Sequence, residues 1–234
     1  MVHHRLIALY FRLGCFIFTL IGLMAETNVF AGEFDITIMV YYTIQSNILA
    51  LILFALLSSR TLKGLRNEGR IGKTGYYARF ELVVVIDILL TMIVYWMLLA
   101  PTMFSMNSSY SQSSFGNIAT HLVTPLLCLI DYFAFTDSGH LHYKDVYSVL
   151  IYPLLYMIVS SIAGLLGYVY RINPDGTPVR FPYFFYNFDQ IGAQALIYIS
   201  ALVLFFLLLS HGFYLLDKKI NKPVLIPKQK RFSS

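Results

Sequence analysis

The chain has 234 residues, of which 58% are hydrophobic and only 12% are charged. A soluble domain usually carries about a quarter charged residues, so this composition excludes an ordinary water-soluble globular protein. The formal charge is +5, but the basic residues fall in segments between apolar runs. That distribution indicates orientation in a membrane better than binding to nucleic acid. The two cysteines, Cys15 and Cys128, lie inside apolar runs and predict packing residues, not a disulfide.

Six apolar stretches are each long enough to cross a bilayer as a helix. A span needs about 20 apolar residues at a rise of about 1.5 Å per residue. The sequence predicts spans at about 6–24, 36–57, 80–100, 117–135, 146–168 and 191–216. Their interiors lack the period-two alternation of a membrane β-barrel. We therefore expect an all-α, six-transmembrane-helix bundle in which residues 1–234 form a single membrane domain.

Basic residues are concentrated on one side of these six spans. The link at 58–79 and the tail after residue 217 are both rich in Lys and Arg, whereas the opposite side has only Arg171 and Arg180. The side richer in Lys and Arg is the cytoplasmic one, so both termini are expected in the cytoplasm. The alternative is a cleaved signal peptide with a small-residue pattern at 29–31, which would leave five spans and a basic tail outside.

Two links on the non-cytoplasmic side have distinct compositions. The link at 101–116 is rich in Ser and Asn and contains the sequon at 107–109, which matters only in a eukaryotic secretory pathway. The link at 169–190 has turn residues and then an aromatic run at 181–188, apolar but too short to span. This run is either a lid on that face or a plain aromatic anchor at the lipid headgroups.

Two polar residues fall near the outer boundary of the apolar spans, where polar groups are costly and point to function. Thr43 on the second span and His121 on the fourth are expected on the order of 6–10 Å below that boundary. They would meet if the two spans are neighbours. A neutral His can accept the proton of a Thr hydroxyl and make it a nucleophile toward an ester. The alternative is structural, because membrane Thr commonly bonds its own helix and a buried His often only packs.

A second layer of ionisable residues is expected near the cytoplasmic side. Arg12, Asp87 and Asp131 fall at similar distances from the inner ends of spans one, three and four. An Arg held between two carboxylates avoids leaving a bare charge in hydrocarbon. We therefore expect these three residues to form an inner ion-pair cluster, with a proton relay as the alternative.

Short motifs on the second and fourth spans resemble a known family. They are the segment YTIQSN at 42–47, the pair His121 and Pro125, and the acidic residue Asp131 that follows. The chain is similar in these positions to six-span bacterial relatives of the androgen-induced and androgen-dependent membrane proteins. Animal members of that family are threonine-dependent hydrolases of fatty acid esters of hydroxy fatty acids.

The resemblance implies roles for particular residues. Thr43 would be the nucleophile and His121 its base, in the plasma membrane of a bacterium. A third, base-orienting group is not evident, and Asn47 and Asp189 are the candidates for a supporting role. The resemblance does not carry a substrate over to this chain.

The sequence thus favours an intramembrane hydrolase of a lipid ester. The alternative is a non-catalytic lipid-binding or proton-coupled transport protein, in which Asp87 and Asp131 exchange protons. Expected partners are a membrane lipid or fatty acid ester, and anionic lipid headgroups at the basic link and tail; no nucleic acid is expected. The sequence has no P-loop, dinucleotide fingerprint or zinc-protease motif, so we expect no cofactor and no metal.

Overall fold

The computed structural model describes residues 3–101, 113–137, 139–173 and 175–220. Six helices in this part of the chain are long and apolar enough to cross a membrane. They are Arg5–Glu26, Tyr42–Glu68, Ala78–Leu99, Phe115–Phe135, Tyr143–Leu165 and Gln194–Lys219. The predicted all-α polytopic bundle is therefore confirmed. The sequon at 107–109 lies outside the described residues.

Some of the six spans are regular helices and others change their winding. The regular ones are α1 (Arg5–Glu26), α2 (Tyr42–Glu68) and α9 (Gln194–Ile220). The third span is α3 (Ala78–Val94) followed by a wider π turn at Tyr95–Leu99. The fourth is α5 (Phe115–Ile118), a π turn at Ala119–Val123 and α6 (Thr124–Phe135), and the fifth is a 3₁₀ segment at Tyr143–Leu150 and α7 (Ile151–Leu165).

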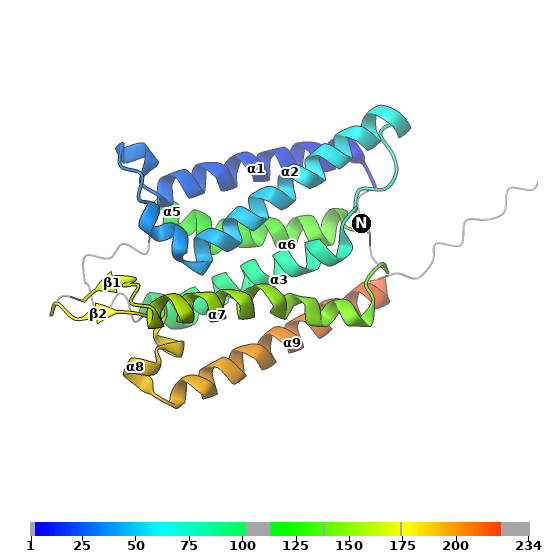
Figure 1. Cartoon of the computed structure of the whole chain (residues 1–234). Coiled ribbons are helices and arrows are strands. Elements are labelled where there is room, and N and C mark those ends of the chain that lie inside the picture. The colour runs from blue at the N-terminus through cyan, green and yellow to red at the C-terminus, as the bar shows by residue number, and fades with distance from the viewer. Residues whose placement is uncertain (1–2, 102–112, 138, 174, 221–234) are drawn as a thin grey trace, which may run out of the picture.

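The links contain the remaining short elements. Two 3₁₀ turns, Val29–Ala31 and Ile36–Val40, follow α1, and a two-stranded antiparallel hairpin, β1 (Arg171–Ile172) and β2 (Pro178–Val179), follows α7. A 3₁₀ turn at Phe184–Tyr186 and the short helix α8 (Phe188–Ile191) lead into α9. We call the end of the bundle that carries β1 and β2 the hairpin end. The opposite end, where α1 begins and α9 finishes, is the terminal end (Figure 1).

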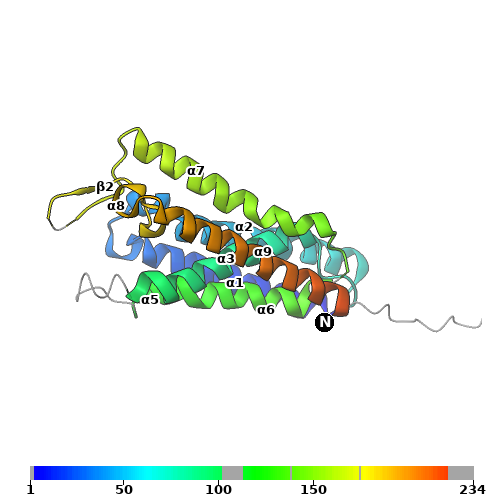
Figure 2. The same cartoon turned by 90° about the horizontal axis from the view of Figure 1, so that it is seen from below.

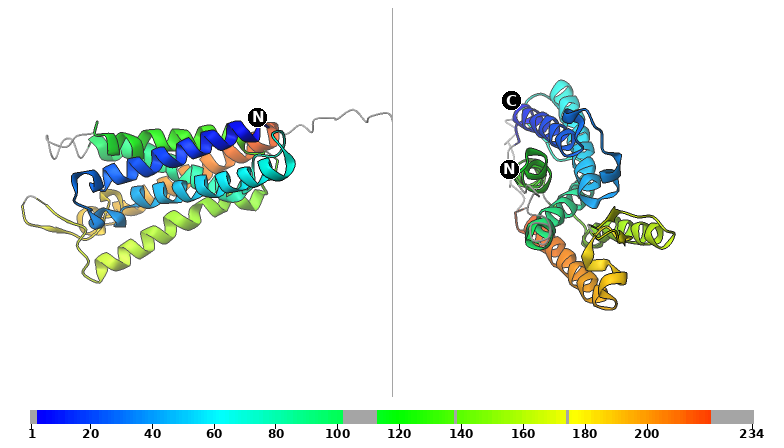
Figure 3. Two further views of the ribbon diagram at one scale, coloured as in Figure 1. Left: turned by 90° about the horizontal axis from the view of Figure 1, so that it is seen from above. Right: turned by 90° about the vertical axis from the view of Figure 1, so that its left-hand side faces the viewer.

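Four of the spans pack as one group, and the last two diverge from each other. α1, α2, α3 and α6 enclose a core in which Phe54, Leu57, Leu82 and Ile86 are fully buried. The α9 helix contacts Tyr143–Leu150 at the terminal end, and α7 and α9 separate toward the hairpin end (Figures 1 and 3). Seen from below, α7 and α9 run in similar directions along the bundle (Figure 2). The segment leading into α8 fills part of the space between them.

The second span begins later than the sequence predicted. Residues Ile36–Val40 form a separate 3₁₀ turn, because the Asp35 carboxylate accepts a hydrogen bond from the main-chain N–H of Thr37 and caps it. Tyr41 is then extended, and α2 starts at Tyr42. Thr43 consequently lies in the first turn of the helix, not about seven residues into a span.

The aromatic run after the hairpin folds into the bundle. Phe181, Phe185 and Tyr186 are buried, and the run packs beside α7 near Gly164. A side chain at Gly164 would place a Cβ 2.0 Å from the carbonyl oxygen of Arg180, so the close approach requires glycine. This burial favours the lid interpretation over a plain anchor at the headgroups, because an anchor would leave the rings at the surface.

The basic link between α2 and α3 is folded against the start of α1. Arg5 is buried and donates hydrogen bonds to the carbonyl oxygens of Gly69, Ile71 and Lys73, and it forms an ion pair with Glu68. These bonds satisfy the carbonyl of Gly69, which caps the end of α2, and two carbonyls of the link that follows. Residues 5–26, which the signal-peptide alternative would remove, are thus integral to the bundle.

Candidate functional site

Thr43 and His121 line the same cavity at the hairpin end. The cavity has a volume of about 420 Å³, and both residues are buried. We call it the polar cavity because charged side chains are part of its otherwise mostly apolar lining. The acidic and basic side chains in its lining, besides His121, are Glu26 at the end of α1, Asp35 in the link after α1 and Arg171 in the hairpin. In the described part of the chain no hydrogen bond joins the Thr43 and His121 side chains directly. The two residues therefore border a common cavity without a hydrogen bond between their side chains.

The His121 ring is oriented by its own helix. Its Nδ1 lies 3.2 Å from the carbonyl oxygen of Asn117 and 3.1 Å from the Thr120 hydroxyl oxygen. The carbonyl can only accept, and the Thr120 hydroxyl already donates to the carbonyl of Gly116 at 2.9 Å. We therefore assign the proton to Nδ1. The second ring nitrogen, Nε2, then carries the lone pair that a general base needs.

Aromatic residues of the third span hold His121 from the other side. The Tyr95 ring stacks on the imidazole with centroids 3.7 Å apart. The Tyr95 hydroxyl lies 2.5 Å from the amide nitrogen of Asn117. The Trp96 indole donates a hydrogen bond of 3.0 Å to the main-chain carbonyl of His121. The ring and the main chain of His121 are thus both fixed in place.

Pro125 explains why that carbonyl needs a donor from another helix. In a regular helix the N–H of residue 125 would bond the carbonyl of residue 121, but proline has no N–H and its ring crowds that carbonyl. The π turn at Ala119–Val123 widens the helix at this point. Trp96, the single tryptophan of the chain, supplies the missing donor. The sequence reading did not identify Trp96, although a lone tryptophan in a span and a proline four residues after His121 were visible signals.

The start of α2 brings Thr43 next to Tyr183. The first N–H groups of a helix have no helical acceptor, and the Tyr183 hydroxyl oxygen accepts the N–H of Tyr42 at 3.0 Å. The same hydroxyl interacts with both the side chain and the main chain of Thr43. Tyr183 belongs to the aromatic run, and sequence reasoning did not select it because that run contains six rings with no feature to distinguish one of them.

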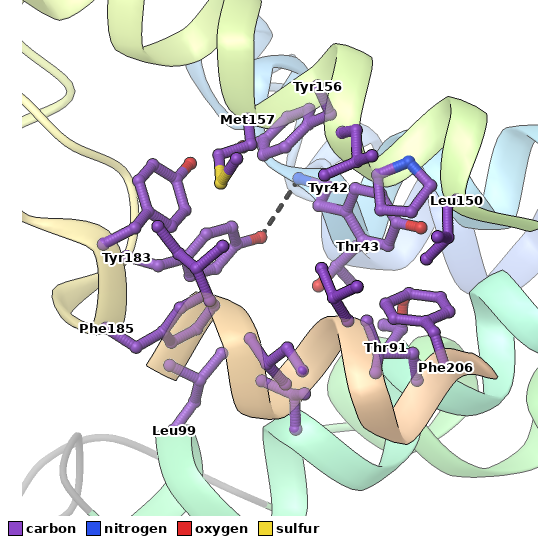
Figure 4. Close-up of a pocket in the computed structure, with 18 residues that line it drawn as sticks. Tyr42, Thr43, Thr91, Leu99, Leu150, Tyr156, Met157, Tyr183, Phe185 and Phe206 are labelled. Atoms are coloured by element: carbon purple, nitrogen blue, oxygen red, sulfur yellow. Dashed lines mark hydrogen bonds between the residues drawn. The ribbon is translucent and has the colours of Figure 1, made fainter. Parts of the chain in front are cut away.

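Thr43 lies where two cavities meet. Besides the polar cavity, it lines a narrow apolar cleft between α7 and α9 (Figure 4). The apolar cleft is bounded by aliphatic and aromatic side chains, including Leu150, Tyr156, Met157, Phe185 and Phe206. Tyr183 and Leu99 line both cavities as well. Thr43 thus borders the apolar cleft and the polar cavity at once.

The two predicted supporting residues lie in different places. Asn47 donates one amide hydrogen to the carbonyl of Thr43 at 2.9 Å and the other to the carbonyl of Thr120 at 3.0 Å. It joins the two helices that carry Thr43 and His121, but it does not contact the imidazole. Asp189 is half exposed and pairs with Arg180 at 2.8 Å, and it lines neither cavity. The structure therefore does not bring Asp189 together with His121.

The inner ion-pair cluster contains two of its three predicted members. Arg12 is completely buried and forms a two-point ion pair with Asp131, at 2.8 Å and 3.1 Å. Its remaining nitrogen donates to the Thr61 hydroxyl at 2.8 Å and to the Thr74 carbonyl at 2.7 Å. These bonds satisfy the guanidinium, so this cluster acts as a structural joint between α1, α2 and α6.

Asp87 is not part of that cluster, which corrects the prediction. α3 begins at Ala78, so Asp87 lies nine residues in, about 13 Å from the helix start. The carboxylate is buried near the Tyr42 hydroxyl. Within the described residues, neither polar group forms a hydrogen bond. A different acid, Glu81, occupies the terminal end of α3 and accepts the N–H groups of Tyr76 and Tyr77.

Comparison with protein-family models, with curated proteins and with solved structures finds no match to this chain. The candidate site is therefore supported by the geometry of the described residues alone.

Proposed function

We propose that the protein is an intramembrane hydrolase of a lipid ester, with Thr43 as nucleophile and His121 as base. The observation that carries the proposal is the position of Thr43 in the walls of two adjoining cavities. One of them also contains His121, and the other is apolar. A lipid ester has matching parts, because its acyl chain is apolar and its carbonyl group is polar. The resemblance of residues 42–47 and 121–125 to threonine-dependent hydrolases points the same way.

In the first step the Thr43 oxygen attacks the ester carbonyl carbon. The hydroxyl proton passes to His121 Nε2, either across a contact formed when substrate binds or through one water in the polar cavity. A C–O bond forms, the carbonyl oxygen becomes negatively charged, and the imidazole becomes a cation. The intermediate then releases the alcohol, which takes the proton from His121, and leaves an acyl-threonine.

In the second step water removes the acyl group. His121, neutral again, accepts a proton from water while the water oxygen attacks the acyl-threonine carbonyl. Collapse of this intermediate breaks the bond to Thr43, and the imidazole returns its proton to the Thr43 oxygen. The products are a fatty acid, an alcohol and free enzyme, and the polar cavity is the route by which water arrives.

Hydrolysis of a fluorogenic fatty acid ester by the purified protein in detergent tests the proposal. We expect turnover by the wild type, with loss of about 10²-fold or more in Thr43→Ala and His121→Ala. Thr43→Ser should retain partial activity because it keeps the hydroxyl. A fluorophosphonate probe should label the wild type and not Thr43→Ala. Equal labelling of both proteins would contradict the assignment of the nucleophile.

A second candidate function is binding or proton-coupled transport of a lipid without hydrolysis. The observation in its favour is Asp87, a buried carboxylate without a hydrogen bond in the described structure, beside the apolar cleft residue Tyr42. Such a group is costly in a membrane unless it takes up a proton. Proton-coupled uptake into liposomes that is lost in Asp87→Asn, together with no ester hydrolysis, would favour this function.

We further propose that both termini are cytoplasmic, in the plasma membrane of a bacterium, and that basic residues of the link and tail contact anionic lipid headgroups. Much of the tail lies outside the described residues. Single cysteines test the orientation well, because Cys15 and Cys128 are buried. With an impermeant maleimide on intact cells, Ile172→Cys should react, and Lys219→Cys should react only after the cells are opened. The reverse pattern would contradict the orientation.

A further inference from the structure

Tyr183 has an unusual set of contacts for a residue in a link. Its hydroxyl oxygen accepts the Tyr42 N–H at 3.0 Å at the start of α2 (Figure 4). It also interacts with Thr43, and its side chain lines both the polar cavity and the apolar cleft. No other tyrosine of the aromatic run combines these three properties in the described structure.

The direction of these hydrogen bonds leaves the tyrosine proton available. A tyrosine hydroxyl has one proton to donate and lone pairs to accept. The Tyr42 N–H occupies a lone pair and orients the oxygen toward the start of α2. Thr43 likewise acts as a donor to this oxygen, so the tyrosine proton can be directed at a group held next to Thr43.

The surroundings keep Tyr183 neutral and hold its ring. Burial raises the pKa of Tyr183 to about 12, so the hydroxyl remains a donor throughout the neutral range. The ring stacks on Phe185 with centroids 5.3 Å apart and also contacts the rings of Tyr41, Tyr156 and Tyr186. A donor fixed in this way does not have to reorganise when charge develops on a substrate.

We propose that Tyr183 is a third catalytic residue, whose hydroxyl donates a hydrogen bond to the ester oxygen that becomes negatively charged when Thr43 attacks. This inference rests on the proposed hydrolase function. The proton stays on Tyr183. The hydrogen bond strengthens as the carbonyl π bond breaks and charge moves to oxygen, and it weakens when the intermediate collapses. The segment at 181–188 thus contributes a reactive group in addition to covering the site.

The test compares Tyr183→Phe with Tyr170→Phe and wild type in the ester assay. Tyr170 lies in the same link and donates to the Ser160 carbonyl at 2.9 Å, and it lines neither cavity. Loss of one donor to an oxyanion commonly lowers kcat by about 10²–10³-fold. We expect that loss in Tyr183→Phe with KM nearly unchanged, because the bond forms mainly in the transition state. Tyr170→Phe should behave as wild type.

A second variant separates donation from packing. Difluorotyrosine at position 183 keeps the ring and the hydroxyl but ionises at lower pH. Its kcat should approach that of wild type at low pH and fall as pH rises through ionisation of the phenol, whereas wild type shows no such fall. A wild-type pH profile in this variant would overturn the donor role, as would full kcat in Tyr183→Phe. If wild type itself hydrolyses no ester, the proposed function fails before the role of Tyr183 is tested.

Discussion

The Trp96 indole nitrogen lies 3.0 Å from the main-chain carbonyl oxygen of His121 and donates a hydrogen bond to it. This contact replaces the helical bond that Pro125 cannot make, and it ties the third span to the fourth next to the candidate base. A helix with a proline at this point would otherwise leave a buried carbonyl without its usual donor. The tryptophan therefore stabilises the widened turn that carries His121.

Replacing Trp96 by Phe should destabilise the protein and reduce activity. The variant keeps an aromatic ring but loses the N–H, so we expect a loss of about 1–3 kcal/mol for the unsatisfied carbonyl. Thermal unfolding in detergent measures the change. Met97→Leu is the control, because Met97 is the next residue and is 71% exposed. Equal melting temperatures for wild type and Trp96→Phe would show that this hydrogen bond is dispensable.

Asn47→Leu should impair catalysis more than stability. The amide of Asn47 joins the main chains beside Thr43 and His121, and without it the two helices can shift relative to each other. Misplacement of reacting groups by about 1 Å can cost about 10²-fold in rate. Ester hydrolysis by Asn47→Leu and by Ser59→Ala, a change at an exposed position on the same helix, measures the effect. An unchanged kcat in Asn47→Leu would contradict the bridging role.

Arg12 and Asp131 should behave as an energetically coupled pair. Removing one member leaves the other charge buried and unpaired. Arg12→Met and Asp131→Leu should therefore each lower the free energy of unfolding by about 3–5 kcal/mol. The double variant should lose clearly less unfolding free energy than the sum of the losses in the two single variants. Unfolding of all four proteins in detergent gives the coupling. Arg180→Met is a control, because that residue pairs with Asp189 at the surface and should lose about 0–1 kcal/mol. If the stability losses of the two single variants add up to that of the double variant, the coupling is ruled out.

Two glycines of α1 should respond to alanine with opposite signs. A Cβ on Gly22 would lie 2.7 Å from the Cβ of Ala119, in the π turn that carries His121, whereas a Cβ on Gly14 would meet nothing within 4 Å. Gly22→Ala should therefore destabilise by about 1–3 kcal/mol through overpacking. Gly14→Ala should stabilise by about 0.5–1 kcal/mol, because alanine favours the helix. Unfolding measurements that give both changes the same sign would contradict this close contact of α1 with the fourth span.

The number of spans can be counted in the sequence because the thickness of the bilayer fixes how long an apolar stretch must be to cross it. Each apolar stretch must be about 20 residues long, and the tertiary structure does not change this minimum length. Boundaries were less predictable. The start of the second span was placed six residues too early, because the run from Ile36 is as apolar as the helix that follows. The extended backbone of Tyr41 separates the two.

Only part of the candidate site could be read from residue types. Thr43 and His121 stand out because polar groups in apolar spans are rare and costly. Asp87 was assigned to the inner cluster from its position along the third span, and Asp189 was named as a supporting candidate without a positional argument. In the structure Asp189 pairs with Arg180 and Asp87 lies near Tyr42, and only packing brings those groups together.

The sequence by itself determined that this protein is a six-helix membrane bundle, since hydrophobic length and the cost of polar groups in lipid depend on the local chain alone. The tertiary structure decided which polar groups share a space. It brought Thr43 and His121 to one cavity, placed Tyr183 at the start of α2, and paired Arg12 with Asp131 and not with Asp87. Those outcomes depend on helix rotation and on contacts between residues distant in the chain, which the pattern of apolar residues does not specify.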